Sequence, residues 1–156
     1  MGERFRIRPA LVHERAGLEA LQWRASLEWE DYRAALLAHP DAIELPAGQI
    51  AAGQVQVAEQ DGIIVGFCVV LPREDGGAEL DGLFVDPPHW RRGIGRRLVD
   101  HAAAAAAQTG AGALHVIANP RALDFYRACG FKPSGEAQTR FGPAMTMLRP
   151  VGSKSA

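Results

Sequence analysis

The pattern that most constrains the fold lies between residues 54 and 86, where apolar and polar side chains alternate with a period of two. An Asp-Gly turn at residues 61–62 and an Asp-Gly-Gly turn at residues 75–77 divide this stretch into three strand-like runs. Asp-Gly between two such runs is a strong hairpin signal, because its turn needs positive φ at the central residues. We therefore expect a three-stranded antiparallel meander. Residues 63–70 are apolar on both faces, which predicts a strand in the interior of the sheet.

Shorter patterns predict the remaining elements. The alternating run at residues 5–8 stops at Pro9 and predicts a strand. Residues 11–39 carry two helical stripes, one with Leu18 and Leu21, the other with Tyr32, Leu36 and Leu37. Residues 40–53 read as a loop with room for one helical turn. The elements expected downstream are a helix at 93–109, a strand at 114–118, a helix at 120–129, and strands at 131–132 and 144–148.

The predicted order of elements is β-α-α-β-β-β-α-β-α-β-β. This order indicates an α/β (α+β) fold with a mixed, mostly antiparallel central sheet flanked by helices. A βαβ crossover follows Val85, because a long helical pattern separates the third meander strand from the next strand. We expect a single domain at residues 1–150, since a chain of 156 residues is one domain's worth, and a flexible tail at residues 151–156.

Composition excludes several classes of protein. The formal net charge is -1, whereas a general nucleic-acid binder carries a clear positive excess. The longest apolar run, residues 63–71, is far shorter than a membrane span of about 20 residues, and no leader-like segment opens the chain. Two cysteines, Cys68 and Cys129, are too few for a disulfide framework. These features predict a cytoplasmic protein with neither a nucleic-acid nor a membrane partner.

The near-neutral total hides an uneven distribution of charge. Residues 1–60 carry 9 acids and 6 bases, and residues 61–156 carry 9 acids and 11 bases, so the formal charges are -3 and +2. Of the 17 bases, 15 are arginine. The planar guanidinium group suits phosphate and carboxylate recognition, although a general preference for arginine in the source genome would explain the same count.

The most informative stretch joins a strand to a helix through glycines, from Leu83 to Leu98. A helix N-terminus presents unpaired N–H groups and a partial positive charge, and Gly93 and Gly95 allow a ligand to approach the backbone. Four arginines surround the turn, and the arrangement suits a pyrophosphate. A dinucleotide fingerprint would need a third glycine at position 98, and a Walker loop would need Gly-Lys-Ser/Thr, so neither motif fits.

Two segments together resemble a known family. Residues 83–98 resemble the acyl-CoA-binding signature of the GNAT N-acetyltransferase superfamily, Gln/Arg-x-x-Gly-x-Gly/Ala, preceded by a strand ending in L-x-V-x-P. Residues 119–131 are similar to the family's N-x-x-A-x-x-F-Y-x-x-x-G-F block and begin 24 residues after Gly95. The resemblance covers residues 54–149, and the first 50 residues match only in the order of elements. Trp90 stands where the signature has Gln or Arg, and Arg91 stands where a glycine is frequent.

The resemblance implies acetyl-CoA as co-substrate and its transfer to a primary amine by direct attack, without an acyl-enzyme. It assigns the acetyl-CoA contacts to Leu83, Phe84, Val85, Arg91, Arg92, Gly93, Ile94, Gly95, Arg96, Asn119 and Tyr126. The backbone of the strand at 83–85 is expected to supply the oxyanion donor and to pair with the pantetheine amides. Because the five histidines show no metal-ligand spacing, we expect no metal.

Two residues are the candidate catalytic groups. Tyr126 matches the family tyrosine that protonates the departing thiolate, and a phenol is protonated at neutral pH. Glu79 lies 14 residues before Gly93, which resembles the place of the catalytic glutamate in histone-acetylating members. Asp81 has the same side-chain parity and is expected to line the same cleft as a substrate-binding group. A base acting through water also remains open.

The acceptor region is expected among the first helices. Trp29, Glu30 and Tyr32 combine aromatic and acidic groups, which suits a cationic amine by cation–π contact and ion pairing. An ordinary amphipathic helix pair would show similar residues. The acceptor is predicted to be a small-molecule amine or a peptide or protein amine. A homodimer is the common state in the family that the chain resembles, but the sequence does not define the oligomeric state. Alternative functions are a non-catalytic acyl-CoA-binding sensor and a nucleotide-binding switch.

Overall fold

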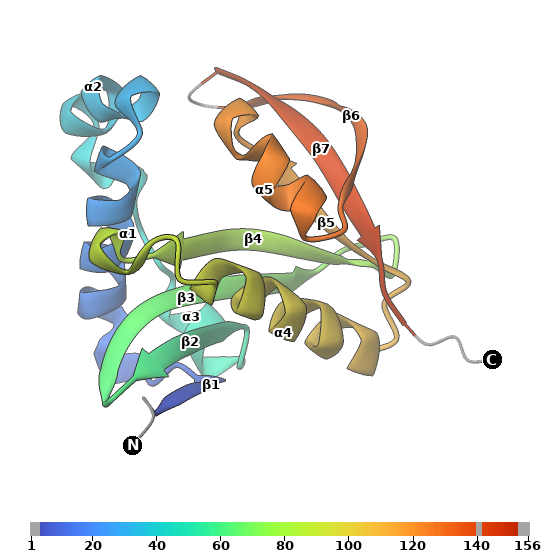
Figure 1. Cartoon of the computed structure of the whole chain (residues 1–156), viewed down its shortest axis with the longest axis horizontal. Helices are drawn as coiled ribbons and strands as arrows, with labels where there is room; N and C mark the ends of the chain where they lie inside the picture. Colours follow the sequence, from blue (N-terminus) through green and yellow to red (C-terminus); the bar gives the residue numbers. More distant parts are fainter. Residues whose placement is uncertain (1–3, 140–141, 153–156) are drawn as a thin grey trace. The chain divides into compact units, whose positions relative to one another are not determined.

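The computed structural model describes residues 4–139 and 142–152, apart from the side chains of residues 30–32. Figure 1 traces the helices and strands in chain order. Their bounds are β1 (Phe5–Pro9), α1 (Arg15–Leu27), α2 (Glu30–Ala38), α3 (Ala47–Ala51), β2 (Val55–Gln60), β3 (Ile63–Pro72), β4 (Ala78–Val85), α4 (Ile94–Gln108), β5 (Ala113–Ala118), α5 (Leu123–Ala128), β6 (Lys132–Thr139) and β7 (Gly142–Pro150).

The strands form one seven-stranded sheet in the order β1-β2-β3-β4-β5-β7-β6. β1 with β2, β2 with β3, β5 with β7 and β6 with β7 pair antiparallel, whereas β4 and β5 pair parallel. The mixed, mostly antiparallel sheet and the crossover after Val85 are therefore confirmed. β3 is an interior strand, as its two apolar faces predict, and residues 65–69 are all buried.

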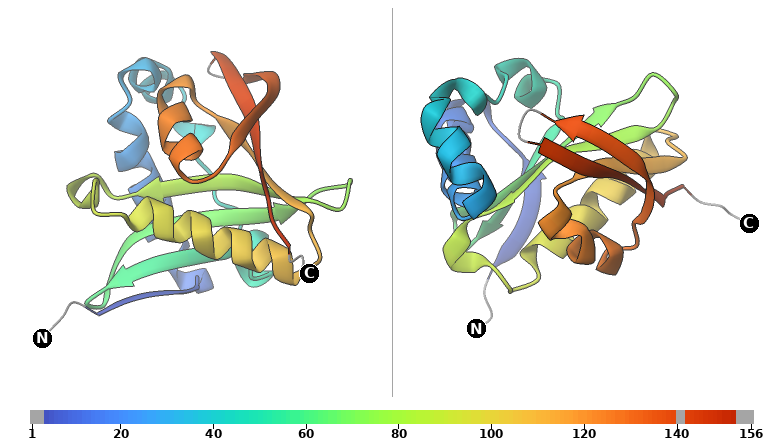
Figure 2. Two further views of the ribbon diagram at one scale, coloured as in Figure 1. Left: turned by 45° about the vertical axis from the view of Figure 1, so that its right-hand side comes forward. Right: turned by 90° about the horizontal axis from the view of Figure 1, so that it is seen from above.

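The chain contains two compact units, and both contribute strands to the sheet. The first comprises Met1–Val69 and Gly82–Leu98, and the second comprises Val70–Asp81 and Val99–Ala156. The boundaries between the units run through β3, β4 and α4. Figure 2 gives two further views of the same elements.

The core of the first unit forms around β2, β3 and the buried stripe of α1. Val55, Val57 and Phe67 have no exposed surface, and Leu18 and Leu21 of α1 are 1% and 2% exposed. Phe67 packs against Phe84 with 5.3 Å between the ring centroids. Leu36 of α2 is buried as its stripe predicts, but Leu37 is 61% exposed, so its place in that stripe was wrong.

α4 joins the two units and follows directly from the glycine turn. Alanine is the strongest helix former, and the apolar positions Ile94, Leu98, Val99, Ala102, Ala103 and Ala106 are all buried. The helix ends before Gly110, whose φ of +88° is the left-handed conformation typical of a helix stop. The N–H of Ala111 closes that stop on the carbonyl of Ala106.

The core of the second unit consists of the inner residues of β5 and β7 with the end of α5. Leu114 and Met147 have no exposed surface, and Phe131 is 2% exposed. β6 extends over eight residues, whereas only residues 131–132 were expected. Most β6 residues are exposed on both faces, so the strand has no alternating pattern that would reveal it. Residues 153–156 of the expected tail lie outside the described residues.

Candidate functional site

A turn of glycines between β4 and α4 carries the first group of predicted site residues, all in the first unit. Gly93 has a φ of +79°, and a Cβ added there would meet no atom within 4 Å. α4 begins at Ile94, and the carbonyl of Gly93 accepts the first helical hydrogen bond from the N–H of Arg97 at 3.1 Å. The first N–H groups of such a helix have no intrahelical acceptor. The turn therefore presents open backbone donors at a positive helix end.

Arginine side chains surround this turn. Arg91, Arg92 and Arg96 are exposed, and no interaction of these three guanidinium groups occurs among the described residues. Arg97 differs, because its guanidinium lies 3.8 Å from the centroid of the Phe5 ring. Arg91 has a φ of +66°, a conformation that costs a non-glycine residue about 1 kcal/mol or more. Three arginines are thus available to an anion, one of them on a strained backbone.

The end of β4 has one edge towards β3 and one edge away from it. A Cβ on Gly66 of β3 would lie 2.8 Å from the carbonyl oxygen of Phe84, and the N–H of Asp86 donates to Val65 at 2.9 Å. Because backbone groups alternate along a strand, those of Leu83 and Val85 point to the other edge. Pairing with β5 includes only Ala78 and Glu79, so that edge carries no further ladder.

Trp90 occupies part of this edge. Its indole Nε1 donates to the carbonyl of Val85 at 2.6 Å, and its ring centroid lies 6.1 Å from that of Trp29 at an interplanar angle of 42°. The carbonyl of Val85 is therefore already occupied. The backbone groups left to contact a ligand at this edge are the N–H and carbonyl of Leu83 and the N–H of Val85. The sequence marks Trp90 only as a departure from the signature and gives no sign of either contact.

The junction of α1 and α2 carries the predicted acceptor residues. Trp29 is the residue before α2, with extended backbone, and its ring contacts Trp90. Arg24 on α1 forms two 3.0 Å hydrogen bonds with the carboxylate of Asp86, which raise the pKa of Arg24. The structure thus brings the junction together with the glycine turn. The side chains of Glu30 and Tyr32 lie outside the described residues.

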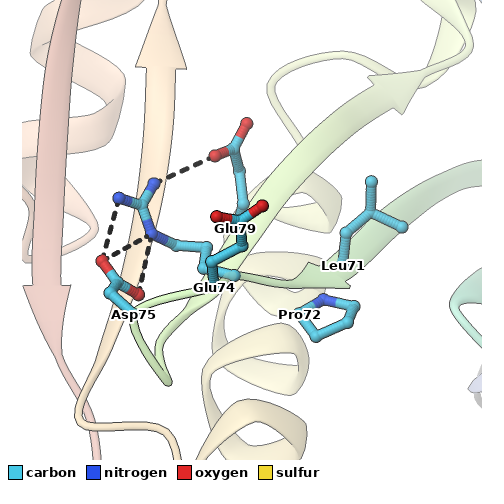
Figure 3. A pocket seen from close by; sticks show the side chains of 6 residues that line it. Leu71, Pro72, Glu74, Asp75 and Glu79 are labelled. Carbon is cyan, nitrogen blue, oxygen red and sulfur yellow. Dashed lines mark hydrogen bonds and ion pairs between the residues drawn. The ribbon is translucent and has the colours of Figure 1, made fainter.

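The two β4 carboxylates belong to the second unit, and they differ in their partners. Glu79 is paired with Arg73 at 3.1 Å, and the same guanidinium makes three contacts of 3.0–3.2 Å with Asp75 (Figure 3). These residues line a cavity of about 410 Å³ at the turn between β3 and β4. Arg73 was not identified from the sequence, although its position before the predicted turn could have suggested a partner for Glu79.

Asp81 has no partner among the described residues and is exposed to solvent. Partial loss of hydration raises the pKa of its carboxyl, and the negative charge of Glu79 raises it further. Because side chains alternate along a strand, Glu79 and Asp81 share one face of β4, and a cleft lined by both stays a prediction. Of the two, Asp81 is the carboxylate that is free to take a proton.

Tyr126 lies near the end of α5 and is 9% exposed. Its ring makes edge contacts with Phe125 and Phe131, at centroid distances of 5.1 and 5.4 Å. Burial raises the pKa of its phenol above the usual value, so the group stays protonated. Its hydroxyl makes no hydrogen bond among the described residues, and it is not among their fully buried unpaired atoms. The hydroxyl is therefore a donor without an internal acceptor.

Asn119 stands at the end of β5, also in the second unit. Its Oδ1 accepts a 2.8 Å hydrogen bond from the N–H of Arg121 and caps the short helix Pro120–Ala122. The capping role holds the amide group in place and leaves its Nδ2 to donate.

The described residues contain neither a cluster of metal ligands nor a helix that could cross a membrane. No group of three or more His, Cys, Asp or Glu side chains that could hold a metal ion occurs within residues 4–139 and 142–152. In the same part of the chain, no helix combines the length and the apolar character that crossing a membrane requires.

The chain resembles a known protein family and several solved structures. The model of the acetyltransferase (GNAT) family matches residues 18–131. PaiA N-acetyltransferase from Thermoplasma acidophilum, solved with coenzyme A, shares 20% identity over 94% of this chain and 99% of that one, with a TM-score of 0.75. The ribosomal-protein-S18-alanine N-acetyltransferase from Escherichia coli shares 20% over 97% of each chain, with a TM-score of 0.71.

A nourseothricin acetyltransferase shares 28% identity with a TM-score of 0.57, and the matched part is 62% of this chain and 64% of that protein's length. No curated protein sequence matches the chain. The mixed sheet with its strand, glycine turn and helix is the fold of the N-acetyltransferases. The chain belongs to the GNAT acetyltransferase family.

Proposed function

We propose that this protein transfers the acetyl group of acetyl-CoA to a primary amine, which attacks the thioester directly. The observation that carries the proposal is the turn at Gly93 in a chain of the GNAT family, where open backbone donors meet three arginines that have no partner among the described residues. A pyrophosphate is the anion that such a helix start takes best. The reaction forms one C–N bond and breaks one C–S bond, and yields the amide, free CoA and one proton.

The residues around the turn fit the CoA phosphates. The open space at Gly93 is where a Cβ would stand, so backbone donors there are accessible to a bulky anion. Arg91, Arg92 and Arg96 are exposed around it, and Ile94 and Gly95 supply N–H groups of the helix start. When bound, acetyl-CoA supplies an activated acyl group and a thiolate leaving group.

The outward edge of β4 is proposed to hold the pantetheine arm. The N–H and carbonyl of Leu83 and the N–H of Val85 are the groups that point to this edge. An extended ligand pairs with such groups as an added strand would, and one N–H can stabilise the oxyanion that develops on the thioester carbonyl. Phe84 supports this edge from the other side, through its ring contact with Phe67. Nδ2 of Asn119 is proposed to donate to the same arm.

Tyr126 is proposed to donate to the departing thiolate. Its raised pKa keeps the phenol protonated, and its hydroxyl has no competing acceptor among the described residues. The same shift makes it a weaker acid, so its contribution is a directed hydrogen bond that stabilises the thiolate, and the thiolate then takes its proton from water.

The carboxylates of β4 are proposed to take the proton of the ammonium group. Glu79 would have to leave Arg73 before it could accept a proton, whereas Asp81 has no partner in residues 4–139 and 142–152. We therefore assign the proton acceptance to Asp81. Glu79 acts with it by supplying the nearby negative charge that raises the pKa of Asp81. This charge also favours a cationic acceptor.

The acceptor is proposed to be a cationic amine, either a small molecule or the amine of a peptide. Trp29 offers an aromatic surface beside the glycine turn, and Glu30 and Tyr32 follow it on α2. The homodimer, the cytoplasmic location and the lack of nucleic-acid and membrane partners stay predictions from the sequence.

An acceptor screen tests the proposed function. Purified protein with acetyl-CoA is given polyamines, amino acids, aminoglycosides and short peptides, and free thiol is followed. We expect one class to accelerate thiol release well above the rate without amine. CoA binding by calorimetry with no acceleration by any amine would instead support an acyl-CoA sensor. Protection by ATP or NAD but not by CoA in a thermal shift assay would support a nucleotide-binding switch.

A further inference from the structure

Trp90 lies in the turn that binds CoA under the proposed function, on which this inference rests. It contacts two different elements, the end of β4 and the residue before α2. The indole N–H holds the carbonyl of Val85 at 2.6 Å, and the ring meets Trp29 at 6.1 Å. Trp90 is 36% exposed, so neither contact is a by-product of deep burial. The ring contact with Trp29 is lost if the signature's Gln or Arg stands at this position, because neither side chain is an aromatic ring.

The junction of α1 and α2 is attached to the turn at a second point. Arg24 of α1 holds Asp86, the residue directly after β4, through two 3.0 Å hydrogen bonds. Paired, charge-assisted bonds of this kind are directional. The N–H of His89 then donates to the carbonyl of Asp86 at 2.8 Å, immediately before Trp90. The ion pair and the tryptophan pair thus lie at the two ends of the segment from Asp86 to Trp90.

We propose that Trp90 is a positioning residue that couples CoA binding to the order of the α1–α2 junction through Trp29. CoA at the turn restricts the backbone around Trp90. The ring contact passes that restriction to Trp29, the residue before α2. If CoA has already ordered the α1–α2 junction, the acceptor amine loses less free energy to ordering when it binds. The two substrates then bind with positive coupling.

Variants of the two tryptophans separate this role from a general effect on folding. Trp90→Gln restores the signature residue, keeps an N–H donor and removes the ring contact, whereas Trp90→Phe removes the N–H donor and keeps an aromatic ring for Trp29. Trp29→Gln removes the ring contact from the other side. Trp23→Phe is the matched control, since Trp23 lies on α1 and has no ring contact among the described residues.

Amide hydrogen exchange of residues 24–33, measured with and without CoA, tests the coupling and needs no acceptor. We expect CoA to slow exchange there in the natural protein and in Trp23→Phe. Trp90→Phe should keep most of the slowing, while Trp90→Gln and Trp29→Gln should lose it. Calorimetry should show CoA affinity within about threefold in all variants, because the backbone donors of the turn remain.

With an acceptor from the screen, Trp90→Gln should raise its KM about tenfold with little change in kcat. The double variant Trp29→Gln/Trp90→Gln should be no worse than Trp29→Gln alone, because Trp90 acts through Trp29. Unchanged CoA-dependent slowing in Trp90→Gln would overturn the coupling, as would equal loss in Trp90→Phe and Trp90→Gln. Absence of CoA binding by the natural protein would instead refute the proposed function itself.

Discussion

The glycine turn of the first unit differs from the candidate catalytic groups of the second in how its functional groups are held. Those groups are Glu79 and Asp81 on β4 and Tyr126 on α5. Around the turn, Arg91, Arg92 and Arg96 are exposed and have no partner within the part of the chain that the structure describes. In the second unit, Glu79 is ion-paired and Tyr126 is buried with a raised pKa. Anion binding needs accessible donors on a rigid backbone, whereas proton transfer needs groups whose ionisation the protein controls. The first region should therefore respond to changes in backbone, the second to changes in single functional atoms.

The largest expected effect is at the phenol of the second region. Tyr126→Phe keeps the ring contacts with Phe125 and Phe131 and removes one oxygen. We expect kcat to fall about 100-fold, because the departing thiolate loses the hydrogen bond that stabilises it. CoA affinity and the melting temperature should stay the same, measured by calorimetry and thermal unfolding. A kcat within threefold of the natural protein would remove Tyr126 from the proposed catalytic group.

The backbone beneath the turn gives the next largest effect. A methyl group on Gly66 would lie 2.8 Å from the carbonyl oxygen of Phe84 and 3.2 Å from Leu98. Because a backbone atom cannot move aside cheaply, Gly66→Ala should lower the free energy of unfolding by about 2 kcal/mol.

Gly17→Ala is the matched control for that change. Gly17 lies inside α1, and its Cβ would meet nothing within 4 Å. It should raise the free energy of unfolding by roughly 0.5–1 kcal/mol, because alanine favours a helix. Chemical denaturation measures both, and a neutral Gly66→Ala would mean that β3 and β4 approach less closely.

A third change separates the shape of the turn from its charge. Gly93→Ala should raise the Kd for CoA about tenfold, since alanine disfavours a φ of +79° and its methyl group enters the open space at the turn. Gly62→Ala is its control, because Gly62 has a φ of +84° and equally open surroundings. It should cost similar stability and leave CoA binding intact. Equal CoA affinity in the two variants would contradict binding at the turn.

The smallest expected effect is a shift in pH dependence. The negative charge of Glu79 helps to raise the pKa of Asp81. Glu79→Gln removes that charge and should lower this pKa, so the acidic limb of the kcat/KM profile moves to lower pH. Profiles taken across roughly pH 5–9 with one acceptor measure the change. A limb that stays in place, or moves to higher pH, would exclude Asp81 as the group that takes the proton.

Local patterns predicted the parts of the molecule that depend on short stretches of chain. The Asp-Gly turn and the alternating runs specified β2, β3 and β4, and the alanine-rich run specified α4. β6 was underestimated, because a strand exposed on both faces carries no periodicity. Leu37 was misplaced, since a small error in helical phase moves a side chain from the buried face to solvent.

The candidate site divides in the same way. The glycines and arginines were visible in the motif, because the turn forms from neighbouring residues. The pairing of Glu79 with Arg73 and the contact of Trp90 with Trp29 depend on side-chain directions that spacing alone does not contain. The left-handed conformation of Arg91 was likewise hidden, because only the departure from glycine appears in the sequence.

Acetyl transfer itself is tested most directly with acetyl-CoA that carries an isotopic label in its acetyl group. The natural protein, Gly93→Ala and Tyr126→Phe are each incubated with the best amine from the screen, and the amide product is measured by mass spectrometry. We predict labelled amide in equal amount to free CoA, less product from Gly93→Ala at low acetyl-CoA, and little from Tyr126→Phe at any concentration. CoA binding without labelled amide from any amine, or product formation that neither substitution affects, would contradict the account.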